Sequence, residues 1–280
     1  MIGNALSHYR IVSRLGQGGM GEVYLAEDTL LHRSVAIKVI RPELADEAAT
    51  GRLVREAQSA AALDHPHICA IHEIGEEGGR RFIVMQYVEG ETLAERLTKG
   101  PLGLREVLDL AIPIADALAE AHRHGIVHRD IKPQNVMIGS RRQVKVMDFG
   151  LAKPIVAAGS PESEAHTRTA LTAPGMVAGT VAYMSPEQAR GERGLDARSD
   201  IFSFGIVLYE MLTGRQPFAT GNSAETLSAI LSRAPGPVAS YQPDAPPELE
   251  RIVGKALRKD REERYQDIKD LALDLTALRE

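Results

Sequence analysis

Apolar and polar residues alternate along two stretches near the N-terminus, a pattern typical of strands with one buried face. These stretches cover residues 9–15 and 22–27, and a cluster of glycines separates them. The spacing predicts a β-hairpin with a glycine-rich turn. Further elements expected in this part of the chain are strands at residues 34–40, 68–74 and 81–87 and one helix over residues 42–63.

After residue 90 the alternation gives way to the three- to four-residue period of helices. The expected elements are a short helix at residues 92–98, a long helix at 104–124, two short strands around 139–142, and helices from 186 onward. Pro113 should kink the long helix, because an interior proline removes a backbone hydrogen bond. Residues 154–178 show no period and predict a long loop that is either functional or disordered.

These two patterns divide the chain into a strand-rich part, residues 1–87, and a mainly helical part, residues 88–280. The expected fold class is α+β, with a small β-rich lobe that contains one main helix and a larger helical lobe. The longest apolar run, residues 201–212, includes Ser203 and Glu210 and is too short to span a bilayer. We therefore expect a buried helix there.

Composition narrows the classes of function. The 280-residue chain has a net charge of −5, so no overall positive field would attract nucleic acid or an anionic membrane. Cys69 is the only cysteine, which excludes an intramolecular disulfide and fits a reducing, cytoplasmic setting. The N-terminus lacks the basic start and long apolar run of a signal peptide.

Gly16, Gly18 and Gly21 form a GxGxxG pattern that is followed by strand residues rather than by a helix. This order argues against a dinucleotide-binding turn and favours a hairpin whose backbone can approach phosphates closely. An ordinary flexible hairpin would explain the glycines equally well when they are taken alone.

Lys38 stands inside the apolar strand VAIK, where a charged side chain needs a partner. Phosphates on one side and the carboxylate of Glu56 on the other would supply that partner. The alternative is an exposed edge lysine whose ammonium group reaches water.

An acid, basic residues and an amide stand at short spacings in HRDIKPQN, residues 128–135, and DFG follows about one hairpin later. Asp130 is the candidate base for a hydroxyl, and Lys132 can neutralise charge on a transferred phosphoryl group. Asn135 and Asp148 offer the oxygen ligands that Mg²⁺ prefers. Each residue alone could be a solvated loop residue, but their joint spacing indicates phosphoryl transfer. The histidine clusters lack cysteine and the HExxH form, which argues against zinc.

In combination and order, these motifs resemble those of protein kinases, specifically the bacterial Ser/Thr kinases of eukaryotic type. The resemblance covers residues 8–275 and includes GQGGMGEV, VAIK, REAQ, HRDIKPQN, DFG and GTVAYMSPE. It implies ATP with Mg²⁺ or Mn²⁺, protein substrates, autophosphorylation, and homodimerisation through the strand-rich lobe. By the same analogy, the chain could be the cytoplasmic part of a larger, membrane-anchored protein.

The resemblance also implies roles for single residues. Lys38 would contact the α- and β-phosphates and pair with Glu56 in the active state, and Asp130 would be the catalytic base. Lys132 would contact the γ-phosphate, and Asn135 and Asp148 would bind the metal. The residues that would enclose the nucleotide, with Met85 as gatekeeper, are Leu15, Gly16, Gln17, Gly18, Gly19, Gly21, Val23, Ala36, Met85, Gln86, Val88 and Met137.

An arginine directly before the catalytic aspartate, here Arg129 before Asp130, is the feature of kinases controlled by phosphorylation of the activation segment, residues 148–187. The candidate acceptors are Thr167, Thr169 and Thr172, of which Thr172 is favoured. Thr180 would belong to the substrate pocket and order the side chains of Asp130 and Lys132. The plain alternative is that these threonines are polar loop residues.

Two further contacts follow from the resemblance: Glu187 should pair with Arg264, and Asp200 should hold the backbone of the catalytic loop. The segment SPE replaces the usual APE, and Phe202 replaces a tryptophan, but neither change touches the chemistry.

Two other functions remain as alternatives. A pseudokinase that serves as a nucleotide-binding scaffold should have lost Lys38, Asp130 or Asp148, and all three are present. A small-molecule kinase of related fold is disfavoured by the complete SPE and GT segments, which favour a polypeptide acceptor.

Overall fold

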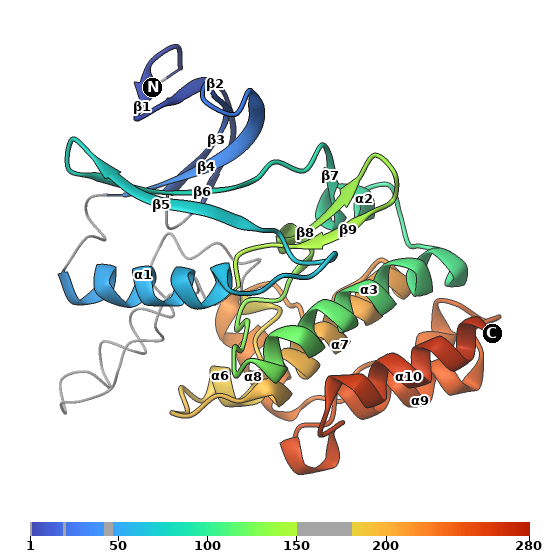
Figure 1. The fold of residues 1–280 in the computed structure, drawn as a ribbon. Coiled ribbons are helices and arrows are strands. Elements are labelled where there is room, and N and C mark those ends of the chain that lie inside the picture. The colour runs from blue at the N-terminus through green and yellow to red at the C-terminus, as the bar shows by residue number, and fades with distance from the viewer. Residues whose placement is uncertain (1, 19–20, 42–46, 150–180) are drawn as a thin grey trace.

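The computed structural model of the chain describes residues 2–18, 21–41, 47–149 and 181–280. In this part of the chain, a strand-rich lobe stands above a helical lobe (Figure 1). The large sheet of the upper lobe ends with Gln86, and the next strand belongs to a separate small sheet. The change of pattern predicted from the sequence therefore falls close to a real change of architecture.

The strand-rich lobe contains a six-stranded antiparallel sheet with the order β1-β2-β3-β4-β6-β5. Its strands are β1 (Ala5–Leu6), β2 (Tyr9–Gly18), β3 (Gly21–Asp28), β4 (Arg33–Ile40), β5 (Ile71–Glu77) and β6 (Arg80–Gln86). The predicted glycine hairpin is confirmed, because β2 and β3 pair up to Gly18 opposite Gly21. The short strand β1 was not predicted.

The strand expected at residues 68–74 begins three residues later, and the hydrogen bonds explain why. Ile68 forms an isolated bridge with Val146 of the other lobe, and the Cys69 amide donates to the Val146 carbonyl at 2.9 Å. The backbone of this segment is therefore already paired before it can join the large sheet.

Apolar clusters cover both faces of the large sheet. The cluster on one face includes Tyr9, Ile11 and Tyr24. The cluster on the other includes Ile83 and Ala57, a fully buried residue of α1 (Glu47–Ala61). This helix thus closes the face of the sheet that points toward the rest of the molecule, as Figure 1 shows.

The helical lobe is built from short strands and seven helices among the described residues. The strands β7 (Gly90–Thr92), β8 (Val136–Gly139) and β9 (Val144–Val146) form a small antiparallel sheet. The helices are α2 (Leu93–Leu97), α3 (Leu104–Arg123), α6 (Pro186–Ala189), α7 (Ala197–Thr213), α8 (Ser223–Ser232), α9 (Pro247–Ala256) and α10 (Ile268–Arg279). The long helix α3 continues as one element through Pro113.

The buried helix predicted at residues 201–212 is confirmed as the centre of α7. Its apolar side chains are enclosed, and α3, α9 and α10 pack around it. Gly205 permits the close approach of α9, because a Cβ there would lie 2.9 Å from the Ala256 Cβ. In the part of the chain that the structure describes, we find no helix with the length and apolarity needed to cross a bilayer.

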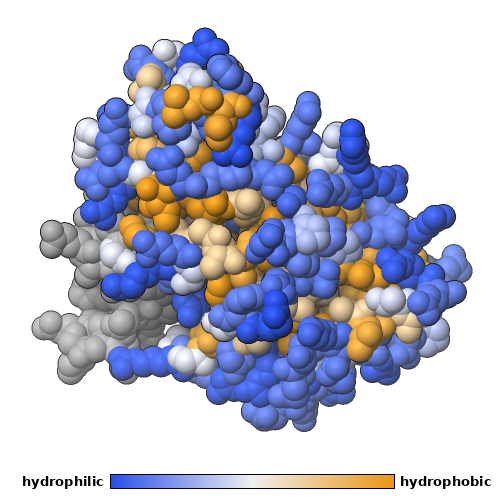
Figure 2. All heavy atoms as spheres, in the orientation of Figure 1, coloured by the Kyte–Doolittle hydropathy of each residue, from blue (hydrophilic) through white to orange (hydrophobic). Residues whose placement is uncertain are grey.

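The surface differs from this interior. Figure 2 shows a mainly hydrophilic face, with apolar atoms gathered on the strand-rich lobe and along its border with the helical lobe. That border is where the candidate site residues meet.

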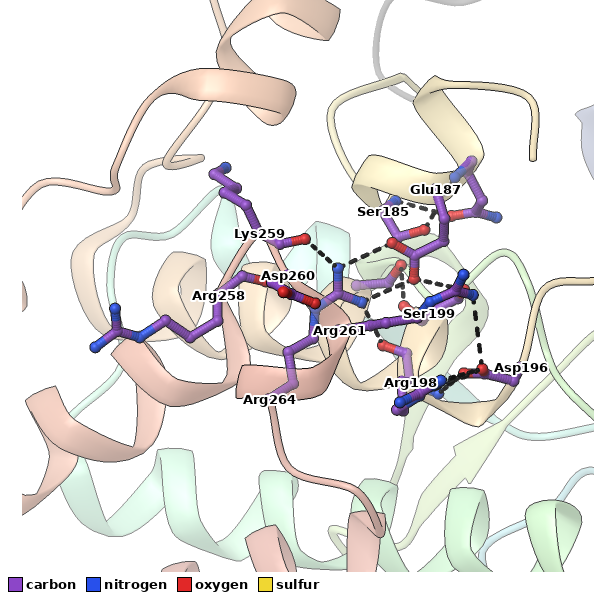
Figure 3. A network of polar contacts seen from close by, with 12 residues as sticks. Ser185, Glu187, Asp196, Arg198, Ser199, Arg258, Lys259, Asp260, Arg261 and Arg264 are labelled. Carbon is purple, nitrogen blue, oxygen red and sulfur yellow. Dashed lines mark hydrogen bonds and ion pairs between the residues drawn. The ribbon is translucent and has the colours of Figure 1, made fainter.

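A buried ion pair ties α6 to the segment before α10. Arg264 Nη1 and Nη2 donate to the two Glu187 oxygens at 2.7 and 2.9 Å, and the side chains are 0% and 3% exposed. Burial alone would raise the pKa of Glu187, but the Arg264 guanidinium holds it below its usual value. Glu187 also accepts a hydrogen bond from the Ser199 hydroxyl (Figure 3). Arg264 also donates to the backbone carbonyls of Arg198, Arg258 and Lys259. The predicted Glu187–Arg264 contact is thus confirmed.

Replacement of Arg264 by alanine should lower the free energy of unfolding by about 3–5 kcal/mol, because Glu187 would remain as an uncompensated buried charge. Urea unfolding followed by far-UV circular dichroism measures this, since the chain has no tryptophan for fluorescence.

Arg258→Ala is the matched control. Arg258 and its partner Glu263 are 63% and 61% exposed and 3.9 Å apart, so that loss should stay below about 1 kcal/mol. Equal losses in the two variants would show that burial of the Glu187–Arg264 pair is not what stabilises this region.

Candidate active site

One face of the large sheet carries residues predicted to meet a nucleotide. Val23 lies opposite Lys38 in the pairing of β3 with β4, and Ala36 lies opposite Met85 in the pairing of β4 with β6. Directly opposed residues share a face, as do residues two apart on one strand. All four side chains therefore lie on the same face, and Val23, Ala36 and Met85 pack in one apolar cluster.

The other members of the predicted adenine set are more exposed to solvent. Leu15 at the end of β2 is exposed, and Gln86, Val88 and Met137 are half-buried. The Gln86 amide donates to the Ala70 carbonyl at 2.9 Å, which fixes the connection between the lobes at this point.

Cys69 contributes a contact that the sequence did not predict. Its Sγ donates to the Gln86 carbonyl at 3.4 Å. Burial raises the pKa of this thiol to about 12, so it stays protonated and can act as a donor. The apolar sequence around Cys69 fits its burial but gives no sign of the hydrogen bond.

The glycine loop is shaped by close backbone contact. At Gly21 only glycine fits, because a Cβ would lie 1.9 Å from the Val39 carbonyl oxygen. Gly16, Gln17 and Gly18 form the end of β2, and the Arg41 guanidinium, a further unpredicted contact, donates to the Gly18 carbonyl at 3.1 Å. Gly19 lies outside the described residues, as do Thr167, Thr169, Thr172 and Thr180.

Hydrogen bonds to Asp200, a buried residue of α7, hold the catalytic loop in place. The backbone amides of His128 and Arg129 donate to its two oxygens at 2.7 and 2.8 Å, and His122 Nε2 lies 2.8 Å from Oδ2. Burial alone would raise the pKa of Asp200, but these partners, His122 first, keep it below its usual value. This bears out the role predicted for Asp200.

Arg129 has a strained backbone. Its φ of 67° lies in the left-handed region, which costs a non-glycine residue about 1–3 kcal/mol unless its surroundings enforce it. Here both polar backbone groups are held: Asp200 binds the amide, and Gln188 Nε2 donates to the carbonyl at 2.7 Å. Gln188 was missed from sequence, although Ser185 and Gln188 form the S-x-x-Q capping box that begins α6.

Asp130, Lys132 and Asn135 converge as their spacing predicts. Lys132 Nζ lies 2.6 Å from Asp130 Oδ2, and Asn135 Nδ2 donates to the Asp130 carbonyl at 2.8 Å and to Oδ2 at 3.1 Å. The Met147 amide donates to the Asn135 carbonyl at 2.9 Å. This backbone hydrogen bond fixes the residue directly before Asp148 against Asn135, the other candidate metal ligand.

Lys38 joins the two lobes through Asp148, with Nζ 2.7 Å from Oδ2. Burial alone would raise the pKa of Asp148, but the Lys38 ammonium group keeps it below its usual value and therefore ionised. The expected partner Glu56 instead lies near Arg129, with Oε1 3.6 Å from Nη1. The observed pairs are therefore Lys38 with Asp148 and Arg129 with Glu56. The sequence had suggested that Lys38 pairs with Glu56 in the active state.

The residues present suit a hard divalent cation. The side-chain hydrogen bonds of Asn135 to described residues both use Nδ2, and the Lys38 contact uses Oδ2 of Asp148. Among the described residues, Oδ1 of Asn135 and of Asp148 is thus not used in these contacts, and it is an oxygen ligand of the type that Mg²⁺ and Mn²⁺ prefer.

Comparison with known proteins agrees with this geometry. The family model "Protein kinase domain" matches residues 9–272. The serine/threonine-protein kinase PknB of Mycolicibacterium smegmatis is 43% identical over 97% of this chain and 43% of its own length. PrkC of Bacillus subtilis is 45% identical over 98% of this chain and 41% of its own length. The chain thus spans about two fifths of the length of these curated relatives.

Among solved structures, the kinase domain of Mycobacterium tuberculosis PknI superposes with a TM-score of 0.76 at 27% identity, covering 99% of this chain and 98% of that one. This confirms the predicted two-lobed α+β fold. Together with the family match over residues 9–272, it shows that the chain belongs to the protein kinase family.

Proposed function

We propose that the chain is a Ser/Thr protein kinase that transfers the γ-phosphate of ATP to hydroxyl groups of proteins in the cytoplasm. The observation that carries this proposal is the convergence of Asp130, Lys132 and Asn135, with the Lys38–Asp148 pair beside them. The Ser/Thr kinases named above, which match nearly the whole chain, support the class of acceptor.

In the proposed reaction, Asp130 takes the proton of the acceptor hydroxyl as that oxygen attacks the γ-phosphorus. The bond between the γ-phosphorus and the oxygen of the β-phosphate breaks, and ADP leaves with that oxygen. Both side-chain hydrogen bonds that Asp130 accepts from described residues use Oδ2, so Oδ1 remains for the acceptor. Lys132 offsets negative charge on the transferred group, and Lys38 binds the other phosphates. Asn135 and Asp148 would hold Mg²⁺, which would supply positive charge to offset that of the phosphates.

Incubation with ATP and Mg²⁺ should add phosphate to the protein itself and to an added acceptor such as myelin basic protein. Asp130→Asn, which keeps the shape but removes the base, should lower the rate of transfer about 10²–10⁴-fold. Intact-mass spectrometry and initial rates measure both effects.

Asp148→Asn serves as the control for metal-dependent transfer and should carry no added phosphate. No incorporation by the unsubstituted protein, with either Mg²⁺ or Mn²⁺, would sink the kinase proposal and favour a nucleotide-binding scaffold.

We further propose that phosphorylation of the activation segment switches the charge pairs around Arg129. A phosphate carries about −1.5 to −2 charges and would compete with Glu56 for the Arg129 guanidinium. Glu56 could then pair with Lys38, which would leave Asp148 free for the metal. Support comes from the long Arg129–Glu56 contact of 3.6 Å and from the partly exposed Arg129 side chain. Thr172 is the proposed acceptor, with Thr169 as second candidate, and Thr180 is proposed to order Asp130 and Lys132.

Thr172→Ala should therefore lower the rate of transfer to an added acceptor about 5–150-fold, the usual range of coupling between two sites. The rates are compared after prolonged incubation with ATP, with Thr169→Ala as the matched control. Turnover equal to that of the unsubstituted protein would mean that Thr172 is a bystander.

A homodimer through the strand-rich lobe is also proposed. Leu30 and Leu31, in the turn between β3 and β4, are 69% and 65% exposed. Asp28 fixes this turn, since its Oδ1 accepts hydrogen bonds from both leucine amides at 3.1 and 3.0 Å. Two ordered, outward-facing leucines offer apolar area for a second copy of the chain.

Replacement of Leu30 and Leu31 together by serine should weaken self-association in sedimentation equilibrium and slow autophosphorylation at low protein concentration. Leu273→Ser is the control, because Leu273 on α10 is 66% exposed but lies in the other lobe. Unchanged association in the double variant would exclude this turn as the interface.

A further inference from the structure

Gln188 is a buried amide that no step of the proposed reaction uses. It is 5% exposed and lies in α6, directly after the ion-paired Glu187. Its side chain nevertheless reaches the catalytic loop, where Nε2 donates a hydrogen bond of 2.7 Å to the Arg129 carbonyl.

The chemistry of its partners allows only one orientation of this amide. Oε1 accepts a hydrogen bond from the Ser185 backbone amide at 2.9 Å, and a backbone amide can only donate. Nε2 faces the Arg129 carbonyl, which can only accept. A carboxylate of the same shape could make the first contact but not the second.

The peptide bond between Arg129 and Asp130 is thus held on both edges. Gln188 donates to the carbonyl of this peptide, which belongs to Arg129. The amide of the peptide belongs to Asp130 and lies 3.3 Å from His128 Nδ1. Because a peptide is planar, these contacts set the orientation of the plane and so the direction in which the Asp130 side chain leaves the backbone. The left-handed φ of Arg129 means that the plane would relax if one contact were lost.

We propose that Gln188 is a positioning residue for phosphoryl transfer. It holds the Asp130 carboxylate toward the acceptor, and the position of this carboxylate therefore depends on the position of α6. The kinetic part of this inference rests on the proposed kinase function. The structural part, the hold on the Arg129–Asp130 peptide, does not.

Gln188→Glu tests the kinetic part, because it keeps the shape of the side chain but replaces the donor with a carboxylate oxygen that can only accept at neutral pH. At neutral pH, kcat for transfer to myelin basic protein should fall about 10–100-fold, as expected when a largely buried acceptor loses its partner. The KM for ATP should change little, because the phosphate-binding residues are untouched.

The pH profile separates positioning from general damage. A protonated glutamic acid can donate to the Arg129 carbonyl again, so the rate of Gln188→Glu relative to the unsubstituted protein should recover as the pH falls. The charged neighbours, Glu187 with Arg264 and Asp200 with His122, are already paired. The introduced carboxyl group is therefore the new titrating group at this place.

Gln242→Glu is the matched control. Gln242 Nε2 also donates to a backbone carbonyl, that of Leu212, at 3.0 Å, but it lies away from the catalytic loop. This variant should lose some stability and keep the kcat and pH profile of the unsubstituted protein. Thermal melts of both variants, at each pH used, establish that folded protein is compared.

Hydrogen exchange tests the structural part without any turnover. At neutral pH, residues 128–135 should exchange faster in Gln188→Glu than in the unsubstituted protein or in Gln242→Glu. Unchanged exchange overturns the inference whether or not the protein is active. An active protein whose Gln188→Glu variant keeps its kcat at every pH overturns it too. Faster exchange in the variant of an inactive protein would refute the kinase function but support the hold on the peptide.

Discussion

The arrangement of the catalytic loop depends on one buried carboxylate, that of Asp200. It accepts hydrogen bonds from two consecutive backbone amides of the loop and lies within hydrogen-bond distance of His122. A carboxylate so enclosed is stable only while these donors remain, so the loop and α7 fix each other. The loop residues Asp130, Lys132 and Asn135 follow directly after this attachment in the chain. The apolar packing of α7 supplies the rigid base from which the carboxylate acts.

The two lobes meet through charged side chains. Lys38 belongs to the sheet and Asp148 to the segment after β9, and their contact joins the two lobes. Glu56 on α1 lies toward Arg129 of the catalytic loop, so helix and loop are linked by a second, longer contact. The Arg129–Glu56 contact therefore links the position of α1 to that of the catalytic loop. The fold thereby connects the phosphate-binding face of the sheet with the catalytic loop of the helical lobe.

Much of this was readable from sequence because it rests on short-range patterns. The glycine hairpin, the buried α7 and the grouping of Asp130, Lys132 and Asn135 depend on residues that are near one another in the chain. The choice of partner for Lys38 was not readable, since Asp148 lies 110 residues away and Glu56 is an equally suitable anion. Gln188 shows the same limit. Its capping box is a local signal, but its contact with Arg129 spans 59 residues. The later start of β5 likewise reflects the pairing of Ile68 with a strand of the other lobe.

The left-handed backbone of Arg129 has a consequence for how this protein can change over time. Glycine adopts a φ of 67° without steric strain, so it would relieve the backbone at this position. The same substitution would remove the guanidinium group that faces Glu56. Relief of the backbone and retention of the Glu56 contact therefore exclude each other at this single position.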